Sequence, residues 1–396
     1  MKYDIFLSIC QLRVDGYKPD EKTMFQNFFD QVVLADELDF GTAWVAETHL
    51  STMVQKENKK PVVPHFDGEI GLNTDILQLA HQVFARTEKI QLGSAIRNIL
   101  CNGGPIAHAE AIRYFLSLHG LNAQEKRKIN IGFASGRFEF SNRPYGVVPR
   151  DAVEETAWPV VKGKILWQAT EIFLRLLKGE QFSSEEIQPM SLSASDFRSS
   201  EEWQSVLKVY GKDVETIPLK NFYEFEKVGV IPFEAPLDLL ELTIGTHDEK
   251  IQEMANSILP VGVFNLSITP PAVIEATHER MKKQFHPSGG VWQRWMMPRT
   301  AMIFLDRDSE KAQKIAKSAW RNYWSAMEGT IDNEKVERAV HNALVGNPEE
   351  IAGQIKEKYH PEDRLMLWFD FNNHDNEMVK GSMRMFMEEV RPLVEA

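Results

Sequence analysis

Short apolar runs alternate with amphipathic stretches along most of the chain. Residues 3–9 (YDIFLSI) form a compact apolar run that is followed by Asp15 and Gly16, a pattern typical of a buried strand. Apolar residues between Met24 and Val33 then recur at steps of three and four residues, which predicts a helix with one face on that strand. The chain therefore opens with a predicted strand and a helix that covers it.

The same unit recurs to the end of the chain. Strands are predicted at 3–9, 42–46, 90–95, 129–133, 239–244, 260–264, 299–305 and 364–370. After the first helix, further helices are predicted near 73–85, 105–118, 155–178, 247–257, 271–284, 309–324, 349–358 and 375–391, the last ending before Pro392. This alternation requires parallel strands with helical crossovers. Residues 1–396 are thus predicted to form a single-domain TIM-type (β/α)8 barrel, although an open doubly wound sheet would give the same alternation.

Residues 180–236 interrupt the alternation after the fourth helix. They include the polar run SLSASDFRSSEE, a short amphipathic stretch from Trp203 to Tyr210, and proline-containing segments at 218, 232 and 236. A long insertion in a compact domain is often an active-site lid or a binding loop. A surface excursion packed by its own side chains would have a similar composition, so both interpretations stay open.

Composition narrows the classes of partner. The formal net charge of −12 opposes nucleic-acid binding, since the basic residues are dispersed among acids. The chain has two cysteines, in no metal-binding spacing, and its first residues lack the pattern of a signal peptide. No stretch approaches the roughly 18 to 20 apolar residues of a membrane helix. We therefore expect a cytoplasmic protein that binds neither membrane nor nucleic acid.

The end of the second predicted strand carries the first candidate chemistry. Barrel enzymes place their active sites where strands pass into the following loops. The sequence TAWVAETHL puts Glu47, Thr48 and His49 at this point. His49 is a candidate general acid or base because the ordinary pKa of histidine lies near neutrality. A structural histidine that bonds to the backbone or to Glu47 is the alternative.

Small and amide side chains mark the end of the third predicted strand. In LGSAIRN, Ser94 and Ala95 would let a flat ligand approach the backbone, and Asn98 can both donate and accept hydrogen bonds. Such a pair of small residues also occurs where a strand end simply packs tightly.

The loop after the fourth predicted strand has the features of an anion site. Ser135 and Gly136 precede Arg137 in the sequence GFASGRF, and Arg143 follows. Accessible amides next to an arginine suit a phosphate monoester. Alternatively, the arginines could pair with nearby acids such as Glu139.

A helix start after the fifth predicted strand offers a second side to this site. Thr246 and Glu249 have capping-box spacing, with Gly245 as the turn residue. The free amides of a helix N-terminus bind anions, although most capping boxes bind nothing. The similar segment 347–350 (NPEE) is predicted to cap a later helix in a purely structural way.

Several common catalytic motifs are missing. The sequence contains no Walker loop, no GxGxxG after the first strand, no GxSxG and no HExxH. This argues against a nucleoside triphosphatase, a dinucleotide-binding fold, an α/β-hydrolase and a zinc protease.

Taken together, the strand ends resemble the luciferase-like flavin-dependent oxidoreductases and monooxygenases, the family of bacterial luciferase. The matching stretches span nearly the whole chain and are LADELDFGTAWVAETHL, KIQLGSAIRNIL, INIGFASGRFEFSNRPYGV, GTHDEKIQEMA, VGNPEEIAGQIKEKY and LMLWFDFNNHDNEMVKGSMRMFMEEVRPL. The resemblance implies a TIM barrel with a flavin at the carboxyl ends of its strands. It also implies that the loops after the fourth and fifth strands hold the phosphate.

The same resemblance assigns roles to individual residues. Residues 94–96 would lie beneath the flavin ring, where some members have a non-proline cis peptide, and His49 matches one histidine of the family's Glu-His-His motif. The candidate cofactor-binding residues are Glu47, Ser94, Ala95, Asn98, Ser135, Gly136, Arg137, Gly245, Thr246 and His247; the candidate catalytic residue is His49, and no metal site is predicted.

Two departures from the family pattern qualify these roles. Thr48 stands where luciferase has its catalytically implicated histidine, which weakens any expectation of light emission or aldehyde oxidation. Ser135 stands where luciferase has a phosphate-binding arginine, and Arg137, two positions on, can replace it.

The resemblance implies a flavin-dependent monooxygenase. It would take reduced FMN from a separate flavin reductase and use O2 to oxygenate a small organic substrate, with His49 handling a proton and 180–236 closing over the site. A deazaflavin-dependent dehydrogenase and a flavin-binding protein without turnover are the alternatives. Family members often form homodimers near the early strands, and the phenylalanine-rich first helix would suit such a contact or simply pack within the chain.

Overall fold

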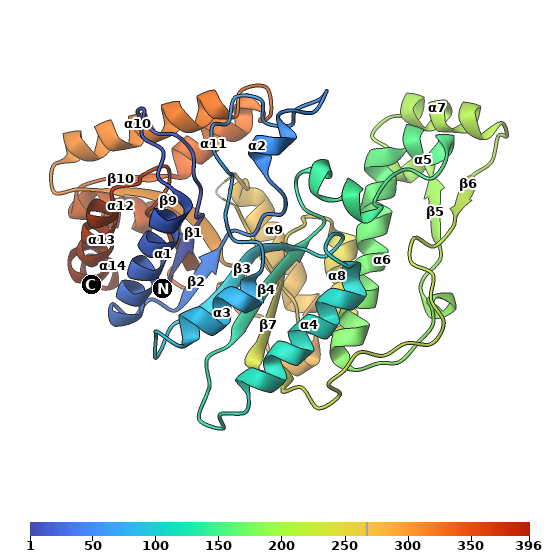
Figure 1. The fold of residues 1–396 in the computed structure, drawn as a ribbon, viewed down its shortest axis with the longest axis horizontal. Helices are drawn as coiled ribbons and strands as arrows, with labels where there is room; N and C mark the ends of the chain where they lie inside the picture. The colour runs from blue at the N-terminus through green and yellow to red at the C-terminus, as the bar shows by residue number, and fades with distance from the viewer. Residues whose placement is uncertain (267) are drawn as a thin grey trace.

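The predicted strands come together in one parallel sheet that curls round on itself (Figure 1). A computed structural model describes residues 1–266 and 268–396, and these ranges hold a main sheet of nine strands in the order β10-β9-β11-β1-β2-β3-β4-β7-β8. Beyond β8, the amide of Asn265 donates to the carbonyl of Pro298 at 3.1 Å, and the amide of Thr300 donates to the carbonyl of Asn265 at 3.1 Å. This bridge closes the sheet and confirms the predicted (β/α)8 barrel.

All eight predicted strands are present. Their bounds are β1 (Lys2–Leu7), β2 (Thr42–Val45), β3 (Gln91–Asn98), β4 (Ile129–Ala134), β7 (Leu240–Ile244), β8 (Gly262–Val263), β9 (Arg299–Leu305) and β11 (Arg364–Trp368). One further strand, β10 (Leu344–Gly346), was not predicted. It lies beside the second half of β9, with Leu344 aligned to Ile303, and is too short for its apolar pattern to be recognised.

Helices cover the outside of the barrel. The predicted ones are α1 (Glu21–Glu37), α3 (Ile76–Phe84), α4 (Gly104–His119), α6 (Trp158–Lys178), α8 (Glu249–Ile258), α9 (Pro271–Gln284), α10 (Ser309–Ala326), α12 (Pro348–Lys358) and α13 (Asn376–Met385). The short or additional ones are α2 (Thr52–Gln55), α5 (Ala152–Thr156), α7 (Ser200–Tyr210), α11 (Asn333–Asn342) and α14 (Arg391–Glu395). Within residues 1–266 and 268–396, no helix is both long enough and apolar enough to cross a membrane.

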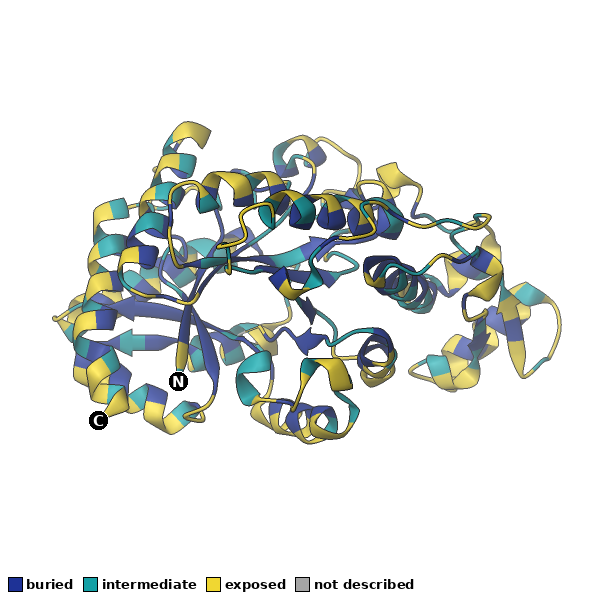
Figure 2. Cartoon of the chain, turned by 90° about the horizontal axis from the view of Figure 1, so that it is seen from below, coloured by how far each residue is buried: buried dark blue, intermediate teal, exposed yellow. Residues whose placement is uncertain are grey.

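The core lies inside the barrel and between the barrel and its helices. All four residues of β2 and five of the six in β1 are buried. Figure 2 shows the strands mainly in the colour of buried residues and the outward helix faces mainly in that of exposed ones. Strands buried on both faces have continuous rather than alternating apolar sequences, which explains the short apolar runs.

Helix α1 uses its phenylalanines within the chain. Met24, Phe28 and Val32 are buried against the barrel. Phe29 is partly buried, and the guanidinium of Arg86 lies 4.6 Å from its ring centre. Packing within one chain therefore accounts for these residues, and the homodimer stays a prediction.

The insertion 180–236 follows the fourth helix, as predicted, and lies beside α6, at the right of Figure 1. It contains α7, which matches the amphipathic stretch, and an antiparallel pair, β5 (Met190–Ser193) and β6 (Thr216–Leu219), which was not predicted. The buried side chain of Gln168 in α6 anchors it, because its Oε1 accepts from the amides of Phe222 at 2.7 Å and Tyr223 at 3.2 Å.

The end of the chain corrects one prediction. The last helix was expected to stop before Pro392, but a π-helical turn (Phe386–Val390) leads directly into α14, which contains this proline in its first turn. Proline is tolerated there because the first-turn amides need no partner inside the helix. The predicted structural cap at 347–350 is confirmed, since Asn347 and Glu350 form a reciprocal capping box at the start of α12.

Candidate active site at the carboxyl ends of the strands

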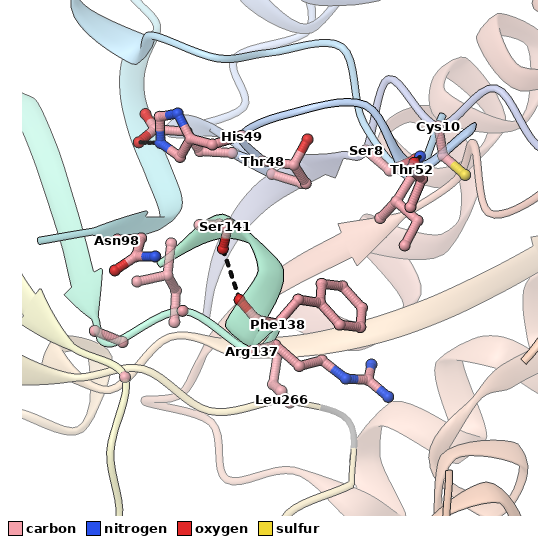
Figure 3. Close-up of a pocket in the computed structure, with 18 of the residues that line it drawn as sticks. Ser8, Cys10, Thr48, His49, Thr52, Asn98, Arg137, Phe138, Ser141 and Leu266 are labelled. Carbon is pink, nitrogen blue, oxygen red and sulfur yellow. Dashed lines mark hydrogen bonds and ion pairs between the residues drawn. The ribbon is translucent and has the colours of Figure 1, made fainter. Parts of the chain in front are cut away.

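A cavity of about 440 Å³ opens at the carboxyl ends of the barrel strands, and Figure 3 shows part of its lining. Its volume lies within the range of small-molecule and cofactor sites. The predicted residues that line it are Glu47, Thr48, His49, Ala95, Asn98, Ser135, Gly136, Arg137 and Gly245. Three others, Ser94, Thr246 and His247, are not part of the lining. The strand ends thus bring most of the candidates to one place.

Glu47 and His49 form a charged pair at the end of β2. The Glu47 side chain is fully buried, and its Oε2 accepts from Arg97 at 3.2 Å and from the amide of Ile76 at 3.1 Å. Its Oε1 lies 3.5 Å from Nε2 of His49. Burial lowers the pKa of His49, but the interactions of the ring with the neighbouring Cys101 and Glu47 outweigh this effect and raise the pKa to about 9. His49 is therefore protonated at neutral pH and supplies a cation and a proton donor to the cavity.

A second buried histidine holds the arginine behind Glu47. Nε of Arg97 donates to Nδ1 of His108 at 2.9 Å, and the His108 Nε2 lies 3.0 Å from the carbonyl of Cys101. Burial and the nearby Arg97 lower the pKa of His108 to about 3, so this ring is neutral and accepts at Nδ1. No sequence motif pointed to this partner, which α4 supplies eleven residues beyond Arg97.

Thr48 already has a partner of its own. Its hydroxyl donates to the carbonyl of Gly71 at 2.9 Å. The residue that replaces the luciferase histidine therefore holds the segment leading to α3 in place.

The ends of β3 and β4 are tied together by amide side chains. Nδ2 of Asn98 donates to Oδ1 of Asn142 at 2.6 Å, and Nδ2 of Asn142 donates to the carbonyl of Ser135 at 2.9 Å. Gly136 has φ +71° and lies against Asn98, whose amide a Cβ at this position would meet. Asn98 therefore shapes the loop that follows β4.

The β3 end also contains the expected cis peptide, between Ala95 and Ile96. Ala95 lines the cavity, whereas Ser94 is fully buried with a hydroxyl that has no hydrogen-bond partner among the described residues.

The turns after β4 and β7 adjoin, as a shared phosphate site requires. Phe133 aligns with Ile244, and the amide of Gly245 donates to the carbonyl of Phe133 at 2.9 Å. Arg137, on the β4 side, forms no ion pair within residues 1–266 and 268–396, and its guanidinium lies 5.2 Å from the Phe138 ring centre. Glu139, its suggested partner, instead accepts from the indole of Trp158 at 2.8 Å. The cavity thus has an arginine that no carboxylate among the described residues neutralises.

The helix start after β7 corrects another prediction. The cap of α8 is Asp248, not Thr246, and its Oδ1 accepts from the amides of Lys250 at 2.9 Å and Ile251 at 3.1 Å. Thr246 accepts from the amide of Asp248 at 3.2 Å. A carboxylate suits the positive end of a helix and occupies the amides that were expected to bind an anion. Any phosphate contact on this side must come from the turn before the helix.

Segments outside the insertion cover the cavity. Phe66 and Ile70 contribute from the loop after α2, Phe138 and Phe140 from the loop after β4, and Tyr323 from α10. Within the described residues, none of 180–236 lines the cavity. The lid role of the insertion stays a prediction that this arrangement does not support.

The ends of β1 and β11 contribute lining residues that the sequence reasoning missed, namely Ser8, Cys10, Trp368 and Asn372. Behind them, Oδ2 of Asp370 accepts from the amide of Ser8 at 3.4 Å, while Oδ1 has no partner among the described residues. Burial raises the pKa of Asp370 to about 7. The signal available in the sequence was position, since these residues lie at or just after the carboxyl ends of two predicted strands.

The lining fits a cofactor that joins a flat ring to an anionic group. Arg137 and protonated His49 supply positive charge, and Gly136 and Gly245 keep the adjoining turns open to the cavity. Apolar side chains such as Ile96 and Phe138 give much of the remaining wall an apolar surface. A flavin mononucleotide has this combination of properties.

Comparison with known proteins points to the same fold. No known family profile and no curated protein sequence matches the chain. The solved structure of monooxygenase RslO1 from Streptomyces bottropensis is similar at a TM-score of 0.68 and 15% identity, over 99% of each chain. The oxygenating constituent of 3,6-diketocamphane monooxygenase from Pseudomonas putida, in complex with FMN, is similar at 0.57 and 13%, over 99% of this chain and 99% of that one.

A third similar structure is an F420-dependent secondary alcohol dehydrogenase with an F420-acetone adduct, at a TM-score of 0.53 and 13% identity, over 99% of this chain and 98% of that one. At such identities the likeness establishes the architecture alone. The chain accordingly has the TIM-barrel fold of the luciferase-like monooxygenases.

Proposed function

We propose that this chain is a flavin-dependent monooxygenase that binds reduced FMN in the strand-end cavity and uses O2 to oxygenate a small organic substrate. The main support is that the turns after β4 and β7 adjoin at a cavity whose Arg137 has no carboxylate partner within the described residues. Two similar structures are described as monooxygenases, and one of these contains FMN.

Separate parts of the cavity would hold separate parts of the cofactor. Arg137, with the backbone of Ser135, Gly136 and Gly245, would bind the phosphate. Ala95 and the strand end around it would lie beneath the ring. Thr246 and His247 lie just outside the lining and would act through the turn that they share with Gly245.

The bound reduced flavin would supply the electrons that activate O2. His49 would handle a proton and stabilise negative charge that develops beside it, while Glu47 and Arg97 hold its ring in place. The aromatic residues around the mouth would exclude water from the reacting groups.

The proposal includes partners and a cellular setting. A separate flavin reductase would supply the reduced FMN, the reaction would take place in the cytoplasm, and the protein would act as a homodimer. Mass measurement in solution tests the homodimer, and a coupled assay with a reductase tests the supply of reduced FMN.

Equilibrium titration with oxidised FMN, with reduced FMN under anaerobic conditions and with a deazaflavin tests the cofactor. We expect reduced FMN to bind at least about tenfold more tightly than the deazaflavin. The opposite preference would favour a dehydrogenase that transfers hydride without O2. Tight flavin binding without substrate-dependent O2 consumption across a broad panel would favour a binding protein without turnover, and no binding of either cofactor would refute both.

A further inference from the structure

One wall of the cavity differs from the charged part around His49 and Arg137. We call it the β1/β11 wall and define it as Phe6, Ser8, Cys10, Trp368 and Asn372. It belongs to the carboxyl ends of two paired strands, in which Ile5 aligns with Leu367. Figure 3 shows Ser8 and Cys10 at the opposite side of the cavity from His49 and Asn98.

The five side chains of the β1/β11 wall carry no charge at neutral pH, and burial raises the pKa of the Asp370 carboxyl behind them to about 7. Burial raises the pKa of Cys10 to about 12, so its thiol stays protonated. Burial also raises the pKa of Tyr323, the neighbouring phenol on α10. A charged ligand group placed here would lose its hydration without gaining a counter-charge, which is strongly unfavourable. The wall therefore favours an uncharged ligand.

Asn372 nevertheless brings an unsatisfied hydrogen-bond donor to this apolar wall. The residue lines the cavity and is 6% exposed, and its buried Nδ2 has no hydrogen-bond partner among the described residues. An unsatisfied buried donor costs about 1 to 3 kcal/mol, so a ligand oxygen that accepts from Nδ2 would gain affinity.

The backbone holds this donor in an unusual conformation. Asn372 has φ +49°, and Ile9, on the neighbouring strand end, has φ +45°. Asparagine tolerates the left-handed region, but a β-branched residue there is a genuine outlier. Strained residues of this kind cluster at functional sites, which is a second indication that the two strand ends serve a ligand.

We propose that the β1/β11 wall is the substrate subsite and that it takes an uncharged, mainly apolar molecule with one acceptor oxygen, to which Asn372 donates from Nδ2. Trp368 and Phe6, with ring centres 4.5 Å apart, would pack against the apolar body of this molecule. As a substrate assignment this inference rests on the proposed function, but the binding that it describes does not require flavin.

Three probes of nearly the same shape test the subsite in the full-length protein. Acetophenone carries the acceptor oxygen, α-methylstyrene replaces it with a methylene group, and benzoate adds a charge. Binding is measured by calorimetry with saturating oxidised FMN and again without flavin. With saturating FMN, whose phosphate would occupy Arg137, we expect acetophenone to bind at least about tenfold more tightly than benzoate, and tighter binding of benzoate there would overturn the assignment to an uncharged ligand.

The Asn372→Gly variant then tests the donor. Glycine accepts the positive φ, and no hydrogen bond that Asn372 forms within the described residues is lost. We expect the preference for acetophenone over α-methylstyrene to fall by about tenfold. The matched control is Asn373→Gly, because the neighbouring Asn373 bonds to Asp375 and Met378 instead of lining this cavity.

The control should keep the preference within about twofold of the wild type. An unchanged preference in Asn372→Gly, or an equal loss in both variants, would refute the role of Asn372. Failure of FMN to bind, with the acetophenone preference intact in the flavin-free series, would instead overturn the proposed function and leave this inference standing.

Discussion

Oε1 of Glu47 lies 3.5 Å from Nε2 of His49 at the mouth of the barrel. Arg97 and the amide of Ile76 hold the other carboxylate oxygen, so the carboxylate cannot turn away from the histidine ring. This pair keeps a proton on a cavity-lining side chain at neutral pH. The cavity thereby gains both positive charge and a proton donor.

Glu47→Gln should move the pH dependence that His49 controls. The pKa of His49 is raised to about 9, so a step that needs its proton proceeds below that pH and is lost as the pH rises through it. Removing the carboxylate charge should lower this pKa and bring the loss to lower pH. NMR titration of the ring measures the shift directly.

Glu57→Gln serves as the charge-changing control for this experiment, since the exposed Glu57 does not line the cavity. This control variant should leave the pKa of His49 unchanged. An unaltered His49 titration in Glu47→Gln would show that the carboxylate does not control this proton.

Arg137→Met should weaken FMN binding. A charged hydrogen bond to phosphate contributes about 1.5 to 3 kcal/mol, which corresponds to a rise in Kd of about ten- to a hundredfold. Arg143→Met is the matched control, because Arg143 is an exposed arginine in the same loop that does not line the cavity. Fluorescence titration should find the control unchanged, and equal losses in both variants would argue against a phosphate site at Arg137.

Gly136→Ala should destabilise the loop after β4 more than Gly146→Ala does. Both glycines have positive φ, +71° and +84°, and an alanine in either place costs roughly 1 kcal/mol. Only at Gly136 would the added Cβ also collide with Asn98, whereas nothing lies within 4 Å at Gly146. Urea unfolding measures the free energy of unfolding of both variants. Equal losses of stability would mean that the Asn98 side chain moves aside without an energetic cost.

Asp370→Asn should stabilise the fold at high pH. Burial raises the pKa of Asp370 from an ordinary 3.8 to about 7, so the folded chain keeps a proton that the unfolded chain releases. Stability contributed by this group therefore falls as the pH rises between these two values, by up to about 4 kcal/mol. The free energy of unfolding of the variant should exceed that of the wild type at pH 8, and the difference should disappear near pH 4.

Asp213→Asn, at an exposed aspartate of the insertion, is the control for this measurement. Its free energy of unfolding should follow that of the wild type across the same pH range. A pH-independent effect of Asp370→Asn would mean that the carboxyl is ionised in the folded protein.

The order of strands and covering helices was predictable from the sequence. Apolar runs such as residues 3–9 are buried on both faces, so local composition alone marks them, and helix α9 was predicted to the residue at 271–284. The position of Glu47, His49 and Gly136 just after predicted strands was enough to predict that they line one cavity, because parallel strands in a barrel end at the same rim.

The outcome of competition between polar groups, both neighbouring and distant in sequence, required the three-dimensional structure. Asp248 displaced Thr246 as the helix cap because a carboxylate satisfies two amides at the positive end of α8. His108 is the partner of Arg97 because of where α4 packs. The cavity is covered by α10 and the loops after α2 and β4, whereas none of the described residues of 180–236 lines it. The sequence by itself determined the repeating units and the edge at which the chemistry gathers, since these follow from local burial; which side chains meet there depended on three-dimensional packing.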